Sequence, residues 1–253
     1  VRAFEFLKAN TTVTPKVTLP APILLHMYGG GDTGIREGHY DDIEEFWADL
    51  TAAYRREIAA LAEAGATYIQ LDDTSIAFLC DETHRATVRG WGHDPDTLLR
   101  DYAGRMNAVL ADRPEGVTFT MHQCRGNREG NWAAKGGYDA VADVLFNGID
   151  VDGYFLEYDT DRAGGFEPLR FVPKGNKKIV LGLVTSKSGD LESVDELKAR
   201  IDEASKYVSL DQLCLSPQCG FSSNAIGNIL TEEQEWAKMQ MIVELADEVW
   251  GSA

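Results

Sequence analysis

The sequence predicts an α/β protein, and within that class a TIM (β/α)8 barrel that lacks its N-terminal strands in this chain. Short apolar segments alternate with amphipathic ones along all 253 residues, as strands buried on both faces alternate with helices. Polar side chains stand at or just past the C-terminal ends of several strand segments. A barrel gathers all such ends at one mouth, whereas an open sheet gathers only neighbours. We expect one domain over 1–253, truncated at its N-terminus, because about six strands are found where a barrel has eight.

The strand predictions follow from apolar runs with turn signals on either side. Residues 117–124 alternate apolar and polar side chains, which is the period of a strand. Residues 16–27 are predicted as a strand that Pro20 and Pro22 interrupt. The remaining predicted strands cover 67–73, 152–158, 178–185 and 212–216.

The helix predictions depend on apolar stripes at helical spacing and on capping residues. Residues 40–64 carry such a stripe, and Gly65 would end that helix. A helix over 95–110 would begin at the cap Asp94, and a shorter one covers 137–146. Ser193 with Glu196, and Thr231 with Gln234, have the spacing of capping boxes for the last two helices. The glycine-rich residues 28–38 are predicted as a flexible loop of the active site.

The composition excludes several classes of partner. A net charge of −17 argues against nucleic acid and anionic membranes as general partners. Four cysteines in a chain of this length do not make a disulfide framework. The sequence contains no signal peptide and no apolar run of membrane-spanning length, so we expect a cytoplasmic protein that acts on small molecules. The sequence leaves a homo-oligomer open.

A metal site is the sharpest functional prediction. His122 and Cys124 lie two residues apart at the end of a predicted strand, so both side chains can face one point. Glu157 and Cys219 occupy the ends of two later strands. An imidazole, a carboxylate and two thiolates favour Zn²⁺ over Mg²⁺ or Ca²⁺. An isolated His-x-Cys would instead indicate a backbone-bonded histidine beside a half-buried cysteine. The other histidines, His26 and His93 among them, have no partner pattern and are predicted to be structural or superficial.

Four further residues are candidates for contact with a substrate. Asp72 and Asp73 end a strand, where they could cap the following turn or hold a substrate ammonium group. Arg125 could bind a substrate anion or hold a nearby carboxylate. Lys187 could donate a proton or clamp an anion at the barrel mouth, and a solvated lysine is the alternative.

These residues resemble the C-terminal catalytic barrel of cobalamin-independent methionine synthase and its short single-domain relatives. The resemblance implies that His122, Cys124, Glu157 and Cys219 hold zinc and that Asp72 contacts the amino group of the substrate. The sequence departs from the family where Asp73 and Thr74 replace the Glu-Pro that follows this aspartate. It departs again at Lys187, which stands where the family has a catalytic histidine.

The resemblance implies a transferase of methionine biosynthesis: a zinc-dependent methyltransferase that activates a thiol such as homocysteine as a zinc-bound thiolate. The methyl donor would be 5-methyltetrahydrofolate or a corrinoid. Three alternatives remain at this stage. One is a thiol alkyltransferase with another acceptor such as coenzyme M, another is a zinc lyase or hydrolase, and the third is a metal-stabilised binding or methyl-carrier protein without enzymatic activity.

Overall fold

A computed structural model describes residues 1–253 except 37–39, 128–130, 223–224, 226 and 252–253. Its centre is a six-stranded sheet in the order β1-β2-β3-β4-β5-β6, in which every neighbouring pair is parallel. The strands are β1 (Val17–Pro20), β2 (Tyr68–Asp73), β3 (Thr118–Gln123), β4 (Gly153–Glu157), β5 (Lys178–Val184) and β6 (Leu213–Pro217).

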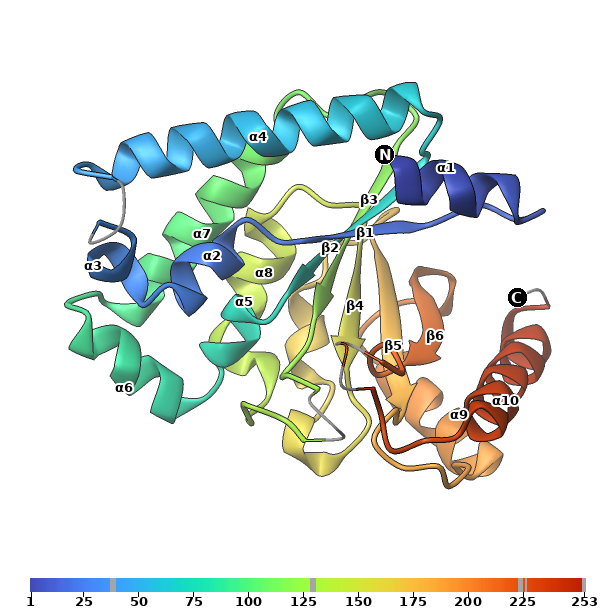
Figure 1. The fold of residues 1–253 in the computed structure, drawn as a ribbon. Coiled ribbons are helices and arrows are strands. Elements are labelled where there is room, and N and C mark those ends of the chain that lie inside the picture. Colours follow the sequence, from blue (N-terminus) through green and yellow to red (C-terminus); the bar gives the residue numbers. More distant parts are fainter. Residues whose placement is uncertain (37–39, 128–130, 223–224, 226, 252–253) are drawn as a thin grey trace.

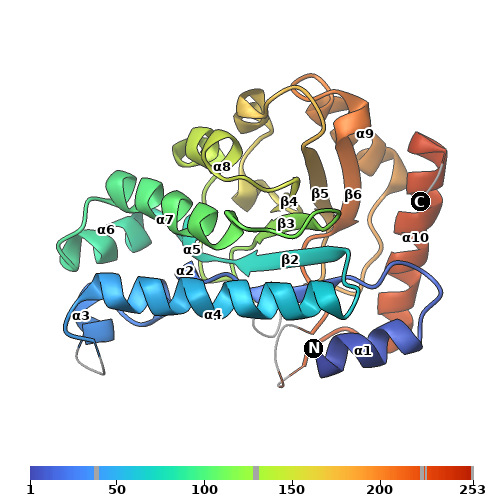
Figure 2. The ribbon, with the colours of Figure 1, turned by 90° about the horizontal axis from the view of Figure 1, so that it is seen from above.

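The strand order confirms the α/β class and favours the barrel over a doubly wound sheet. A doubly wound sheet reverses its strand order at a switch point, whereas this order follows the chain from end to end. The strands fan out around a common centre when the molecule is viewed from above (Figure 2). The outer strands β1 and β6 are not paired with each other in the described part of the chain.

The two faces of the sheet differ in chemistry because side chains alternate along each strand. Ile69 and Leu71 of β2 lie in register with Phe119 and Met121 of β3, and all four are fully buried. The opposite face carries Gln70 and Asp72 of β2 beside Thr120 and His122 of β3. The polar side chains therefore share one face of the sheet, and the apolar core lies on the other.

The α-helices lie around the sheet, with α4, α7 and α8 packed in succession on one another and α10 against β6 (Figure 1). They are α1 (Arg2–Ala9), α2 (Ile23–Tyr28), α3 (Gly31–Arg36), α4 (Ile43–Glu63), α5 (Ser75–Phe78), α6 (Glu82–Gly90), α7 (Pro95–Leu110), α8 (Ala142–Gly148), α9 (Val194–Ala204) and α10 (Glu232–Trp250). Short 3-10 turns are η1 (Tyr138–Ala140), η2 (Asp161–Ala163), η3 (Glu167–Phe171) and η4 (Leu210–Gln212).

The capping predictions are confirmed except for one half of a capping box. Ser193 accepts a hydrogen bond from the Glu196 N–H at the start of α9, without the return bond from the Glu196 side chain in the described part of the chain. Asp94 accepts a hydrogen bond from the Thr97 N–H at 2.8 Å and begins α7, as expected. Thr231 and Gln234 form a complete capping box at the start of α10. Gly65 follows α4 with a φ of +93°, and its N–H donates to the carbonyl of Ala62. A left-handed residue in this place ends a helix.

Two predictions near the N-terminus are wrong. The strand predicted over 16–27 ends at Pro20, and α2 follows it, because the fixed φ of Pro22 suits the start of a helix. The loop predicted over 28–38 contains α3, although its last two residues lie outside the described part of the chain. Helices α5 and α6 were not predicted, and the N-cap Asp81 of α6 was the available signal.

None of the helices in the described ranges is both long enough and apolar enough to cross a lipid bilayer.

A substitution at Gly182 in β5 tests how closely the backbone is packed beneath the site. A Cβ added there would lie 2.6 Å from the carbonyl oxygen of Leu156 and 2.9 Å from Cα of Gln218. We expect Gly182→Ala to lower the free energy of unfolding by about 1–3 kcal/mol through overpacking. Gly104→Ala is the matched control, since no atom lies within 4 Å of its added Cβ in the middle of α7. Urea unfolding should show the control to be slightly stabilised, and equal midpoints for the two variants would contradict this packing.

Candidate active site

The polar face of the sheet opens into a cavity of about 690 Å³ at the carboxyl ends of the strands. That volume lies in the range that holds a small-molecule ligand. The cavity is lined from several strands and the loops after them, with His122, Cys124 and Cys219 among the lining residues. Asp72 and Tyr28 also line it.

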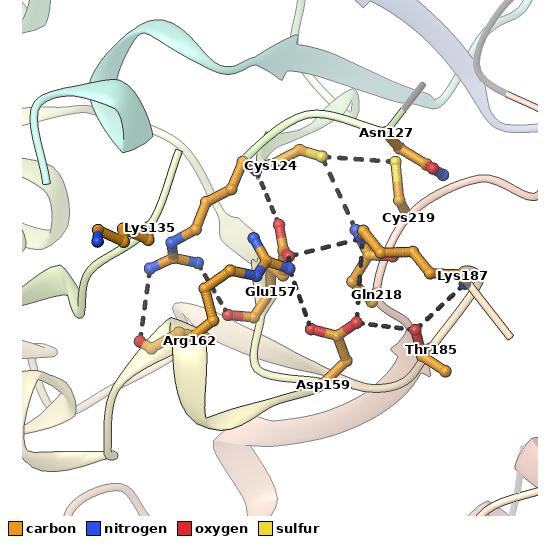
Figure 3. A network of polar contacts seen from close by, with 12 residues as sticks. Cys124, Asn127, Lys135, Glu157, Asp159, Arg162, Thr185, Lys187, Gln218 and Cys219 are labelled. Carbon is orange, nitrogen blue, oxygen red and sulfur yellow. Dashed lines mark hydrogen bonds and ion pairs between the residues drawn. The ribbon is translucent and has the colours of Figure 1, made fainter. Parts of the chain in front are cut away.

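A cluster of two thiols and one imidazole lies on the cavity wall. Ligand atoms of His122, Cys124 and Cys219 all lie within 4.8 Å of one another. Sγ of Cys124 is 3.6 Å from Sγ of Cys219, and Figure 3 marks this contact with a dashed line. Two thiolates bound to one tetrahedral zinc ion would be about 3.8 Å apart, given Zn–S distances of about 2.3 Å. The spacing and the soft donors therefore fit zinc.

The surroundings of Cys124 raise the pKa of its thiol. The hydrogen bond with Cys219, burial, and the negative charge of Glu157 raise the pKa of Cys124 well above its ordinary value, and Lys187 opposes them. Thiolates that repel each other in a buried place are stabilised by a shared cation, which metal coordination supplies.

His122 is oriented by Asp72. Its Nδ1 lies 3.5 Å from Oδ1 of Asp72, a partner that fixes the orientation of the ring, and the ring also has a hydrogen bond with the backbone of Gln218. Burial lowers the pKa of His122, but the hydrogen bond with Asp72 and the negative charges of Cys219 and Asp72 raise it above its ordinary value overall. Asp72 has a side chain that is 39% exposed, so its carboxylate also faces the cavity.

Glu157 lies beside this cluster and not in it. One carboxylate oxygen, Oε2, accepts a hydrogen bond of 2.8 Å from the backbone N–H of Arg125. The other oxygen, Oε1, forms ion pairs with Arg162 and, at 3.6 Å, with Nζ of Lys187. Burial would raise the pKa of Glu157, but Lys187, Arg162 and the Arg125 N–H lower it below its ordinary value. The structure thus assembles three of the four predicted zinc ligands and holds the fourth in a charged network.

Lys187 belongs to the same network. Its side chain is 9% exposed, and Nζ lies 3.6 Å from Glu157 and 3.9 Å from Oδ2 of Asp159. Asp159 also accepts a hydrogen bond of 2.8 Å from the Thr185 hydroxyl (Figure 3). Lys187 is not among the residues that line the cavity. Lys187 therefore contacts two carboxylates behind the cluster. It is not the solvated lysine of the alternative interpretation.

Two predicted substrate contacts, Arg125 and Asp73, bond to neighbouring groups of the protein, and Asp73 also lines the cavity. Arg125 is fully buried, and its guanidinium donates hydrogen bonds to the carbonyls of Gly136 and Glu157 and to the Tyr138 hydroxyl. The alternative prediction was that Arg125 holds a nearby carboxylate. Its backbone N–H does so by donating to Glu157, whereas its guanidinium bonds to other groups. Asp73 is also buried, and its carboxylate accepts the N–H groups of Ser75 and Ile76 at the start of α5.

The floor of the cavity contains polar residues that the sequence analysis did not single out. Nζ of Lys16 donates to Oε1 of Gln70 at 3.0 Å and lies 4.2 Å from the centre of the Phe155 ring. Burial lowers the pKa of Lys16, although the charge of Asp72 opposes the shift. The available signal was the spacing of Gln70 and Asp72, two residues apart on the face that also carries His122.

Two solved bacterial structures have a similar fold. A protein of Listeria monocytogenes, provisionally described as a vitamin-B12-independent methionine synthase, is 40% identical with a TM-score of 0.78, over 99% of this chain and 69% of its own. A B12-independent methionine synthase of Shewanella sp. W3-18-1, solved with selenomethionine, has a TM-score of 0.70 at 20% identity, over 98% of this chain and 65% of its own. The second likeness concerns the fold alone.

Sequence relatives point the same way. The uncharacterized protein YxjH of Bacillus subtilis is 52% identical over 98% of this chain, which spans 65% of the length of YxjH. The methionine synthase of Pyrococcus abyssi is 26% identical over 86% of this chain, which covers 54% of that protein. The model described as "Cobalamin-independent synthase, Catalytic domain" matches residues 7–247. With that match and a relative sharing half of its residues, the chain belongs to the family of cobalamin-independent synthase catalytic domains.

Proposed function

We propose that this chain is the catalytic part of a zinc-dependent methyltransferase that moves a methyl group from a donor to a small-molecule thiol. The observation that carries the proposal is the cluster of Cys124, Cys219 and His122 on the wall of the cavity. Membership of the cobalamin-independent synthase family supports the same reaction class. The two thiols and the imidazole would hold the metal, and the cavity would hold the substrates.

When bound, zinc would supply a positive charge that lowers the pKa of a substrate thiol, so that the thiolate exists near neutral pH. Three protein ligands leave one position for that sulfur. The position faces the cavity, since all three ligand residues line it. Glu157, predicted as a fourth ligand, is held by ion pairs with Arg162 and Lys187, so its ionised carboxylate would stay beside the metal and leave that position to the substrate sulfur.

The chain's own residues would orient the acceptor. Asp72 presents a carboxylate to the cavity, and its pKa is lowered: burial opposes the shift, but hydrogen bonds with His122 and Gln70 outweigh burial. An ionised carboxylate in this place would bind the ammonium group of an amino-acid thiol such as homocysteine. Phe155 and Lys16 also line the cavity, with Nζ of Lys16 4.2 Å from the centre of the Phe155 ring.

The experiment is a thiol panel titrated by calorimetry into the zinc-loaded protein, with homocysteine, cysteine and coenzyme M as ligands. We expect homocysteine to bind tightest and to release a proton, because the bound form is the thiolate. Methyl transfer is then measured with 5-methyltetrahydrofolate and with a methyl corrinoid as donors. If coenzyme M binds tightest, the acceptor is coenzyme M and not homocysteine. If no thiol binds, the proposal is contradicted.

Asp72→Asn is the variant that identifies the acceptor. The asparagine oxygen can still accept a hydrogen bond from Nδ1 of His122, so the metal cluster should persist. We expect homocysteine affinity to fall by about 10-fold or more, which corresponds to the loss of one charge-assisted contact. Coenzyme M has no ammonium group, so its affinity should not fall. An equal loss for both thiols would assign Asp72 to the histidine alone.

A further inference from the structure

A second group of metal-binding side chains lies away from the cavity, on the helical side of the molecule. His26 is in α2, Asp32 is in α3, and His93 precedes the cap of α7. Their ligand atoms all lie within 4.8 Å of one another. We propose that these three residues bind a divalent transition-metal ion, such as Zn²⁺, independently of the thiol cluster and of the proposed methyl transfer.

The geometry centres on one carboxylate oxygen. Oδ1 of Asp32 is 2.8 Å from Nε2 of His26 and 3.5 Å from Nε2 of His93. The two imidazole rings meet edge to face, with their centres 6.0 Å apart. Two imidazole nitrogens and a carboxylate oxygen that converge from three segments form a ligand set for Zn²⁺, Fe²⁺ or a similar ion, with open positions for water.

The remaining ring nitrogen of His26 is held in the way that metal-bound histidines are held. Nδ1 of His26 lies 2.7 Å from the hydroxyl of Tyr102, which is fully buried in α7. Such a partner fixes the ring orientation and directs Nε2 at the ion. The rings of Tyr102 and Trp47 pack on the His26 ring from two sides, at 5.6 and 5.4 Å between centres. The histidine is therefore fixed in position before a metal ion binds.

The surroundings are accessible and do not repel a cation. A space of about 110 Å³ adjoins the three residues. The side chains of Asp32 and His93 are 36% and 27% exposed, which gives an ion a path from solvent. The positive charge nearest the space is Arg105, and both of its terminal nitrogens pair with the carboxylate of Glu44 at 2.8 and 2.5 Å. Because Arg105 is paired with Glu44, the carboxylate of Asp32 gives the site a net negative charge.

A hydrogen bond between His26 and Asp32 would explain that pair alone, but it would not explain why the second imidazole approaches the same oxygen. A bound ion would connect α2, α3 and the segment before α7. Tyr28, two residues after His26, lines the cavity and lies within hydrogen-bond distance of the Thr74 hydroxyl, at 3.1 Å. Through α2, the ion would therefore also fix one wall of the substrate cavity.

The test is metal stoichiometry after equilibrium dialysis against buffered Zn²⁺, measured by mass spectrometry of the metal. We expect two equivalents in the wild-type protein and one in each of His93→Gln and Asp32→Asn. The double variant Cys124→Ser/Cys219→Ser should also retain one equivalent. His84→Gln is the matched control and should keep two, because its ring stacks on Phe78 outside both clusters.

Cobalt substitution identifies which site is lost. Thiolate ligands give Co²⁺ an intense near-ultraviolet charge-transfer band that imidazole and carboxylate do not give. His93→Gln should keep that band while losing one equivalent of cobalt. No metal in the double cysteine variant, or two equivalents in both His93→Gln and Asp32→Asn, would overturn the second site. One equivalent in the wild-type protein would overturn it if the double cysteine variant loses that equivalent; if the double cysteine variant keeps it, the thiol cluster is the site that fails.

Discussion

Cys219→Ser is expected to remove zinc from the thiol cluster and to reduce methyl transfer by at least about 100-fold. The hydroxyl of serine stays protonated near neutral pH and is a poor zinc ligand, so the cluster would keep only Cys124 and His122 as strong donors. Loss of a zinc ligand removes the charge that makes the acceptor thiol a thiolate, and a contribution of about 3 kcal/mol to the barrier corresponds to that factor.

Cys214→Ser is the matched control for this substitution. Cys214 lies in β6, the strand that ends two residues before Cys219, and it is partly buried but not among the clustered ligands. We expect this variant to retain zinc and activity. Metal analysis and transfer rates should be measured on both proteins, with His93→Gln in the background so that only the thiol cluster is counted. Unchanged zinc content in Cys219→Ser would remove Cys219 from the ligand set.

Arg125→Leu is expected to lower the free energy of unfolding by about 3–5 kcal/mol, the usual cost of breaking a buried charged network. The substitution removes the donors to the carbonyls of Gly136 and Glu157 and to the Tyr138 hydroxyl. Glu157 and Tyr138 are buried and Gly136 is half-buried, and leaving their acceptors unpaired adds to the loss. The hydroxyl of Tyr138 also donates to the carbonyl of Gln123, so the loss extends to the end of β3.

Urea unfolding measures this effect, and Arg100→Leu supplies the control. Arg100 is exposed on α7, and its hydrogen bond is to the Thr97 hydroxyl one turn earlier. The control should change stability by no more than about 0.5 kcal/mol. If Arg125 instead bound a substrate anion, its replacement would raise KM and leave the unfolding midpoint almost unchanged.

The sequence was sufficient for the elements that local rules determine. The helix over 95–110 has a cap, a first-turn proline and an apolar stripe that all agree, and its bounds are confirmed. The strand 16–27 was wrong because an apolar run of this length is compatible with either a strand or a helix. The second half of the run forms α2, whose His26 packs against Tyr102 and Trp47 from distant parts of the chain.

The candidate site shows the same division. Strand-end spacing was enough to place His122 and Cys124 on one wall, because side-chain direction in a strand is fixed by alternation. The position of Glu157 depends on three partners that are distant in sequence or follow it: Arg125, Arg162 and Lys187. No local sequence pattern predicts that these partners, and not the metal cluster, hold the Glu157 carboxylate. The group of His26, Asp32 and His93 was missed for the same reason, since two of its members lie 67 residues apart.

The most direct test of the central claim is zinc X-ray absorption on the His93→Gln protein loaded with one equivalent of zinc. The account predicts two sulfur neighbours and at least one imidazole nitrogen, from Cys124, Cys219 and His122. Addition of homocysteine should raise the sulfur count to three as the substrate thiolate joins the ion. A sulfur count that stays at two with saturating thiol would contradict the account, as would a shell made only of nitrogen and oxygen.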